Sequence, residues 1–176
     1  MQHFGNWEFI GYYLNTLETL TALYQRRRSG AVDEALVRAR ARLGSRSVPD
    51  NVAGLRQLLR TLREGGLVAI LPDQVPADES AVVAPFFGRR VLTMSLLSKL
   101  LQRVDVDVVV AAATRVAGGF SIRIETIDGA IHDPDAAASA RVINTAVETV
   151  VRRNPAQYQW EYKRFRLRDE PDIYKR

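Results

Sequence analysis

The apolar and polar residues of this chain follow two different periods. Apolar residues recur at intervals of three and four in several stretches, which is typical of amphipathic helices. The helices predicted in this way span 6–19, 31–44, 51–66, 93–104 and 133–154. Short apolar runs predict strands over 21–25, 67–73, 106–116 and 120–127, and the segment from 74 to Phe87 predicts a loop.

The order of these elements predicts an α/β fold with a mostly parallel central sheet and flanking helices. Gly118-Gly119 separates the last two strands and predicts a late β-hairpin. Since 47% of the 176 residues are hydrophobic and no repeat or second domain is visible, we expect one domain over 1–176.

Composition narrows the chemistry that the chain can perform. It contains no cysteine, which excludes disulfides, thiolate metal sites and a cysteine nucleophile. It also contains no apolar run long enough to cross a bilayer and no secretory signal peptide. The net charge of +5 comes mostly from arginine and favours anionic partners, namely nucleic acid, acidic lipid headgroups or an acidic carrier protein. The alternative is that the runs of charged residues form solvent-exposed helix faces.

The stretch "HFGNWE" (3–8) supplies a candidate general base. On a regular helix, residues five apart face away from each other, so His3 and Glu8 meet only if His3 lies on a turn before the helix. Gly5 permits that turn, and Asn6 is a good N-cap. A carboxylate bonded to one imidazole nitrogen makes the other more basic. The alternative is a packed histidine with an exposed Glu8.

Other motifs for catalysis are absent from the sequence. There is no Gly-x-Ser-x-Gly elbow and no Walker glycine loop. His132 has no neighbours at metal-ligand spacing and is expected on the surface, and we expect no metal. A histidine base without a nucleophile most simply activates a hydroxyl of the substrate.

Several blocks of the sequence carry a family resemblance. "HFGNWE" resembles the H-x4-D/E motif of the lysophospholipid acyltransferase superfamily. Three further blocks, "TALYQRRRSGAVDEAL", "GLRQLLRTLREGGLVAILPDQVP" and "APFFGRRVLTMSLLSKL", are followed by "NPAQYQWEYKRFRLR". In this order they resemble the bacterial lipid A biosynthesis acyltransferases of the lauroyl/myristoyl type, from His3 to about Arg168.

The resemblance implies an activity and its partners. Such enzymes move a fatty acyl chain from an acyl carrier protein thioester directly to a hydroxyl of a lipid A precursor. They use no cofactor beyond that donor and work at the cytoplasmic face of the bacterial inner membrane. The resemblance makes His3 the base and Glu8 its orienting carboxylate. It implies a membrane surface as a partner, and it implies no nucleic acid.

The resemblance also implies substrate-binding residues. The family's tyrosine–arginine block falls on Tyr24 and Gln25, so contact with phosphate or carrier is assigned to the following cluster as a whole. The implied binding residues are Tyr24, Arg26, Arg27, Arg28, Asp73, Gln74 and Arg89. Phe86 and Phe87 either pack in the core or line an acyl channel, and Thr93 is expected to open a helix. Trp160, Tyr162, Lys163, Arg164 and Phe165 match the closing family block, which suits either a membrane interface or core packing.

Family members carry a membrane anchor and a strand before the histidine block. The resemblance therefore predicts that this chain corresponds to a C-terminal portion, N-terminally incomplete, and weakly stable or inactive alone. Two other functions stay open. One is acylation of another glycolipid, such as a phosphatidylinositol mannoside. The other is a basic, non-catalytic module that binds membrane or nucleic acid, for which His3 and Glu8 are dispensable.

Overall fold

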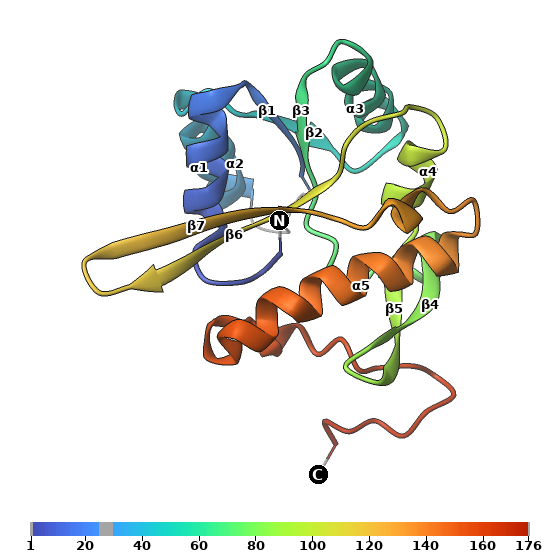
Figure 1. Ribbon diagram of the computed structural model, residues 1–176. Coiled ribbons are helices and arrows are strands. Elements are labelled where there is room, and N and C mark those ends of the chain that lie inside the picture. Colours follow the sequence, from blue (N-terminus) through green and yellow to red (C-terminus); the bar gives the residue numbers. More distant parts are fainter. Residues whose placement is uncertain (1, 25–29, 176) are drawn as a thin grey trace. The chain divides into compact units, whose positions relative to one another are not determined.

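The computed structural model describes residues 2–24 and 30–175 (Figure 1). They form two compact units. One is Glu8–Ile70, and the other joins the residues up to Trp7 to those from Leu71 onward. Among the described helices, none combines the length and the apolar composition that a bilayer crossing requires.

The Glu8–Ile70 unit is built on a parallel sheet. Its strands are β1 (Leu20–Tyr24), β2 (Arg46–Pro49) and β3 (Leu67–Ala69), in the order β2-β1-β3. Both neighbours of β1 run parallel to it. The helices are α1 (Trp7–Leu17), whose first residue lies outside the unit, α2 (Gly30–Arg42) and α3 (Val52–Arg63).

Helix α3 shows how the sequence sets these elements. Asn51 caps it by accepting a hydrogen bond from the Gly54 backbone N–H at 3.1 Å. Leu58 and Leu59 are buried on one face, and α3 packs against all three strands. Gly54 is required because a Cβ there would lie 1.7 Å from the Pro49 carbonyl oxygen.

The other unit is built from two antiparallel strand pairs and a long helix. Its strands are β4 (Ala81–Phe86), β5 (Arg89–Met94), β6 (Val109–Val116) and β7 (Gly119–Thr126), paired β4-β5 and β6-β7. Its α-helices are α4 (Leu96–Leu101) and α5 (Ala136–Arg153). The 3-10 turns are Asp78–Ser80, Gly129–His132, Pro155–Gln157 and Trp160–Tyr162.

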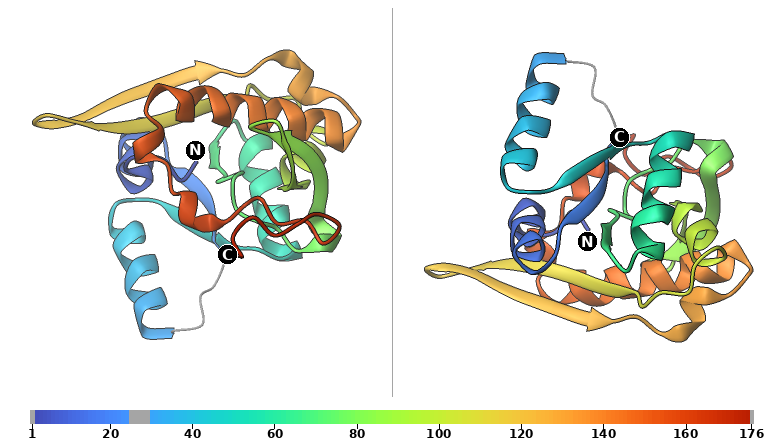
Figure 2. Two further views of the ribbon diagram at one scale, coloured as in Figure 1. Left: turned by 90° about the horizontal axis from the view of Figure 1, so that it is seen from below. Right: turned by 90° about the horizontal axis from the view of Figure 1, so that it is seen from above.

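Helix α5 provides much of this unit's core. Asp135 caps it by accepting from the Ala137 backbone N–H at 3.0 Å. The helix packs on β4 and runs alongside the β6–β7 ribbon in both views of Figure 2. The main apolar cluster joins α5 to the N-terminal segment, the strands and the closing segment. Its buried members are Phe4, Phe86, Val91, Val110, Ala112, Val147, Val150, Val151 and Tyr158.

The predicted α/β fold with a parallel sheet, flanking helices and a late hairpin is confirmed. The prediction of one domain stays a prediction, because two compact units can belong to one domain.

Three local predictions are wrong. The loop to Phe87 contains β4, and the helix expected from Thr93 begins at Leu96. Thr93 belongs to β5, where Val91 and Thr93 are buried on one face with the period of two typical of a strand. The strand predicted over 67–73 ends at Ala69, and β2 was missed because it is only four residues long.

Candidate active site

The segment around His3 is fixed by backbone pairing on both sides. Phe4 pairs with Tyr158, and Gly5 pairs with Ala113 of β6. The Gly5 N–H donates to the Gln157 carbonyl at 2.8 Å, and the Asn6 N–H donates to the Ala113 carbonyl at 2.9 Å. Gly5 has a φ of +57°, and a Cβ there would lie 2.0 Å from the Ala113 carbonyl oxygen. Only glycine can adopt this conformation so close to the Ala113 carbonyl. The turn at Gly5 places His3 just before α1.

Asp73 hydrogen-bonds to both the side chain and the backbone of His3. Its Oδ1 lies 2.9 Å from the imidazole Nδ1, and its Oδ2 accepts from the His3 backbone N–H at 2.8 Å. Both residues are buried, with 2% and 1% of their surface exposed. An ionised carboxylate only accepts hydrogen bonds, so Nδ1 carries the proton and Nε2 keeps its lone pair. This is the arrangement of a general base with an orienting carboxylate.

Aromatic rings fix the plane of the imidazole. Tyr162 lies with its ring centroid 4.2 Å from that of His3, and Trp7 makes an edge contact at 5.7 Å. The Gln159 N–H donates to the His3 carbonyl at 2.9 Å. No described residue hydrogen-bonds to Nε2, so that nitrogen is the ring atom left to act on a substrate.

Tyr158 lies beside this pair. Burial raises the pKa of its phenol well above the usual value near 10, and the negative charge of Asp73 raises it further. The positive charge of Arg164 acts in the opposite sense. Tyr158 therefore lies within electrostatic reach of both charges and stays a neutral phenol at physiological pH.

Of the residues predicted for the site, the structure brings His3 and Asp73 together. Glu8 lies in the first turn of α1, in the Glu8–Ile70 unit, and forms an ion pair with Arg40. Tyr24 ends β1 in the same unit, with the Arg40 guanidinium 5.7 Å from its ring centroid. The orienting role of Glu8 stays a prediction, as do the binding roles.

The remaining predicted residues are spread along the chain. Gln74 is half-buried directly after Asp73, and Arg89 is exposed at the start of β5, paired across the hairpin with Phe86. Phe86 is fully buried in the apolar cluster, and Phe87 packs partly buried against it. Arg26, Arg27 and Arg28 lie outside the described residues.

Sequence reasoning missed the partnership of His3 with Asp73, which lies 70 residues away. The available signal was the "PDQ" block after a buried strand, but it indicated only a binding residue. Tyr158 gave no signal at all, and Arg164 was noted only as part of the closing block.

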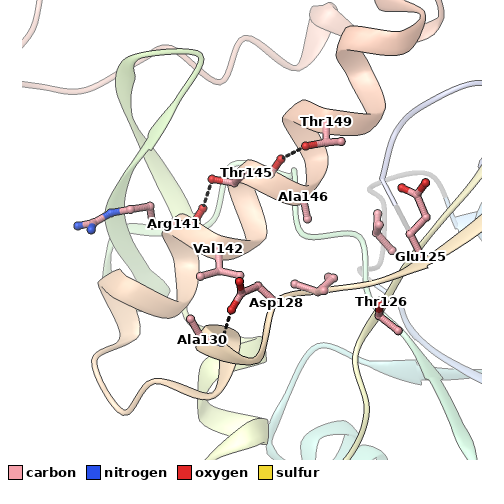
Figure 3. Close-up of a pocket in the computed structure, with 11 residues that line it drawn as sticks. Glu125, Thr126, Asp128, Ala130, Arg141, Val142, Thr145, Ala146 and Thr149 are labelled. Atoms are coloured by element: carbon pink, nitrogen blue, oxygen red, sulfur yellow. Dashed lines mark hydrogen bonds between the residues drawn. The ribbon is translucent and has the colours of Figure 1, made fainter.

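A separate cavity of about 340 Å³ lies between β7 and α5 (Figure 3). Thr145 and Thr149 line it, but their hydroxyls donate to backbone carbonyls one turn earlier in α5. Asp128 caps the Ala130 N–H. These polar groups are engaged within the fold, and none of the predicted site residues lines this cavity.

The α/β fold and the buried histidine–carboxylate pair place this chain in the class of proteins that can perform general-base chemistry. A family model described as bacterial lipid A biosynthesis acyltransferase matches residues 1–167. The chain therefore belongs to the bacterial lipid A biosynthesis acyltransferase family.

Curated relatives agree with this assignment. A lipid A biosynthesis acyltransferase of Haemophilus influenzae is 28% identical over 159 residues, which cover 88% of this chain and 49% of the relative. Lipid A biosynthesis acyltransferase 2 of Shigella flexneri is 25% identical, with 89% and 51% covered. A lipid A biosynthesis palmitoleoyltransferase of Escherichia coli is 25% identical, with 94% and 54% covered. The chain spans about half the length of these relatives.

Proposed function

We propose that this chain takes part in transferring a fatty acyl group from a thioester donor to a hydroxyl of a lipid A precursor. The observation that carries the proposal is the buried His3–Asp73 pair within a chain that matches the lipid A acyltransferase family over residues 1–167. The relatives' names supply the lipid A acceptor.

The chemistry needs one base and no enzyme nucleophile. The Nε2 of His3 takes the proton of the acceptor hydroxyl while its oxygen attacks the thioester carbonyl. The carbon–sulfur bond then breaks, and the leaving thiolate takes the proton from the imidazolium. The orienting carboxylate stabilises the imidazolium while it exists. Asp73 is placed for that role at 2.9 Å from Nδ1, and Glu8 is the second candidate for it.

The binding partners are an acyl carrier protein, a lipid A precursor and the membrane surface at the cytoplasmic face of the inner membrane. The net charge of +5 suits these anionic partners. Arginine forks suit phosphate oxygens, which supports contacts of the precursor with Arg26, Arg27, Arg28 and Arg89. Tyr24 and Gln74 complete the proposed binding set.

An acyl-transfer assay tests this proposal. Labelled acyl carrier protein is supplied with a lipid A precursor or with phosphatidylinositol mannoside, and the chain is assayed alone and extended to the length of its relatives. His3→Ala is expected to lower transfer to the lipid A precursor by at least about 100-fold, because the base is lost.

His132→Ala is the matched control, because His132 is the only other histidine and is exposed. It is expected to leave the rate unchanged. Transfer that persists in His3→Ala contradicts the proposed base. Transfer to the mannoside alone contradicts the proposed acceptor.

A further inference from the structure

The closing segment places a phenol directly beside the candidate base. The Tyr162 ring lies with its centroid 4.2 Å from that of the His3 imidazole, and the two ring planes are tilted by 40°. Tyr162 ends the 3-10 turn Trp160–Tyr162, at the opposite end of the chain from His3. The fold therefore brings a hydroxyl-bearing ring from the end of the sequence into contact with the base at its start.

Backbone contacts hold the turn that carries Tyr162. The Gln159 N–H donates to the His3 carbonyl at 2.9 Å, and the Tyr162 N–H donates to the Gln159 carbonyl at 3.4 Å. Lys163 follows the turn with a φ of +48°, a conformation that is uncommon for residues other than glycine. Residues in such conformations persist where the surrounding structure holds them, and they gather at functional sites. The position of Tyr162 is thus tied to that of His3.

Each of the two facing rings carries a polar atom that the fold leaves unengaged. Within the described chain, neither Nε2 of His3 nor the hydroxyl of Tyr162 takes part in a hydrogen bond. Neither atom belongs to the described side-chain atoms that are both buried and without a partner, so each one reaches the surface. The hydroxyl of Tyr158, in contrast, is one of those buried atoms and is closed to a ligand.

The proposed transfer needs a hydrogen-bond donor in addition to the base. When the acceptor oxygen bonds to the thioester carbon, negative charge moves onto the carbonyl oxygen. A donor aimed at that oxygen accelerates such a step by about 100-fold or more. His3 is not available for this task, because its Nδ1 proton is directed at Asp73 and its Nε2 takes the proton of the attacking hydroxyl.

We infer that the hydroxyl of Tyr162 is the donor that stabilises this oxyanion. Its O–H donates a hydrogen bond to the carbonyl oxygen while the negative charge is there, and its proton is not transferred. When the carbon–sulfur bond breaks, the electron pair on that oxygen reforms the carbonyl, and the thiolate leaves. The inference rests on the proposed function and adds a second residue to its chemistry.

A kinetic comparison of two substitutions tests this role. Tyr162→Phe keeps the ring beside His3 and removes only the hydroxyl. In the acyl-transfer assay it is expected to lower kcat by about 100-fold and to leave KM within about threefold of the wild type, because the bond strengthens in the transition state. Tyr162→Leu also removes the ring and is expected to be no more active than Tyr162→Phe.

Tyr174→Phe is the matched control in the same closing segment. The Tyr174 hydroxyl accepts a hydrogen bond from the Phe165 backbone N–H at 3.3 Å, so it is engaged within the fold. Its loss is expected to leave kcat unchanged. A normal kcat in Tyr162→Phe, with or without a loss in Tyr162→Leu, overturns the inference, because it leaves the hydroxyl no part in the reaction.

A binding measurement that needs no turnover separates this inference from the proposed function. A long-chain alkylphosphonate monoester carries a tetrahedral anion where the thioester has its carbonyl, and the matching alkyl amide carries a planar neutral carbonyl. By isothermal titration calorimetry, Tyr162→Phe is expected to weaken phosphonate binding by at least about tenfold and amide binding by much less, because a hydrogen bond to a charged group is the stronger one.

The two measurements together distinguish which claim fails. Equal weakening of both probes in Tyr162→Phe overturns the inference. A full kcat in Tyr162→Phe with transfer lost in His3→Ala upholds the proposed function and overturns the inference. Selective loss of phosphonate binding in Tyr162→Phe, in a chain whose transfer survives His3→Ala, upholds Tyr162 as the donor and contradicts His3 as the base.

Discussion

The imidazole of His3 is tied at one nitrogen and left unengaged at the other. Asp73 meets it twice, once at Nδ1 and once at the backbone N–H. A carboxylate with both oxygens used in this way cannot rotate without breaking a buried hydrogen bond, which is costly in the interior. The pair therefore defines the tautomer of His3 by geometry.

Tyr158 carries the clearest pH dependence beside this pair. Its pKa is raised by burial and by Asp73, so it stays protonated where exposed tyrosines ionise, near pH 10. Because the folded-state pKa is above the unfolded value, its contribution to stability is present below about pH 10 and is lost as pH rises further.

Alkaline titration of tyrosinate absorbance checks this prediction. The chain has six tyrosines. Tyr158→Phe is expected to remove no equivalent of the native titration until the chain unfolds. A loss of one equivalent from the native titration in Tyr158→Phe would show that Tyr158 ionises in the folded chain.

The strand-like segment that carries His3 depends on one close backbone approach. Gly5 lies against β6 where a Cβ would meet the Ala113 carbonyl oxygen. Gly88, in the β4–β5 turn, has a φ of +73° but no atom near its missing Cβ. Gly119, at the start of β7, has neither constraint. Substitutions at these three glycines therefore distinguish the effect of steric overlap from the effect of backbone strain.

Alanine at each position tests this account by urea unfolding. Gly5→Ala is expected to lower the free energy of unfolding by more than about 2 kcal/mol, because overlap and strain both act. Gly88→Ala is expected to cost about 1 kcal/mol from strain alone. Gly119→Ala is expected to stay within about 0.5 kcal/mol of the wild type. A Gly5→Ala variant as stable as Gly119→Ala would refute the close approach.

Elements with a clear periodicity of apolar residues could be predicted from the sequence, and elements without one could not. Helices α3 and α5 carry capping residues and apolar faces, so their existence and type were predicted. Strand β4 lies in the segment from 74 to Phe87 that was predicted as a loop, and it contains Pro85. The structure accommodates it in a two-stranded pair, where its carbonyl accepts from the Asn144 side chain at 3.0 Å.

At the candidate active site, too, only features that are visible within a short stretch of sequence could be predicted. The spacing of His3 and Glu8 is visible in one short stretch of sequence, so it suggested a local pair. The carboxylate that meets Nδ1 comes from a residue 70 positions away, and such a contact is created only by the fold.

At the scale of the whole molecule, the 45 acidic and basic residues give a net charge of +5, which favours anionic partners. Among the residues whose burial the structure describes, the buried charged ones, Asp73 and Arg164, lie in the unit that joins the N-terminal residues to those from Leu71 onward. The family match over residues 1–167 extends over both units.

The central claim is that Asp73 is the orienting carboxylate of His3, and a paired substitution tests it most directly. The measurement is the acyl-transfer rate of Asp73→Asn and Glu8→Gln, each a neutral variant of nearly equal shape. The account predicts that Asp73→Asn loses at least about 100-fold in rate, because the tautomer and the imidazolium are no longer supported, and that Glu8→Gln loses much less. Loss of transfer in Glu8→Gln with normal transfer in Asp73→Asn would contradict it.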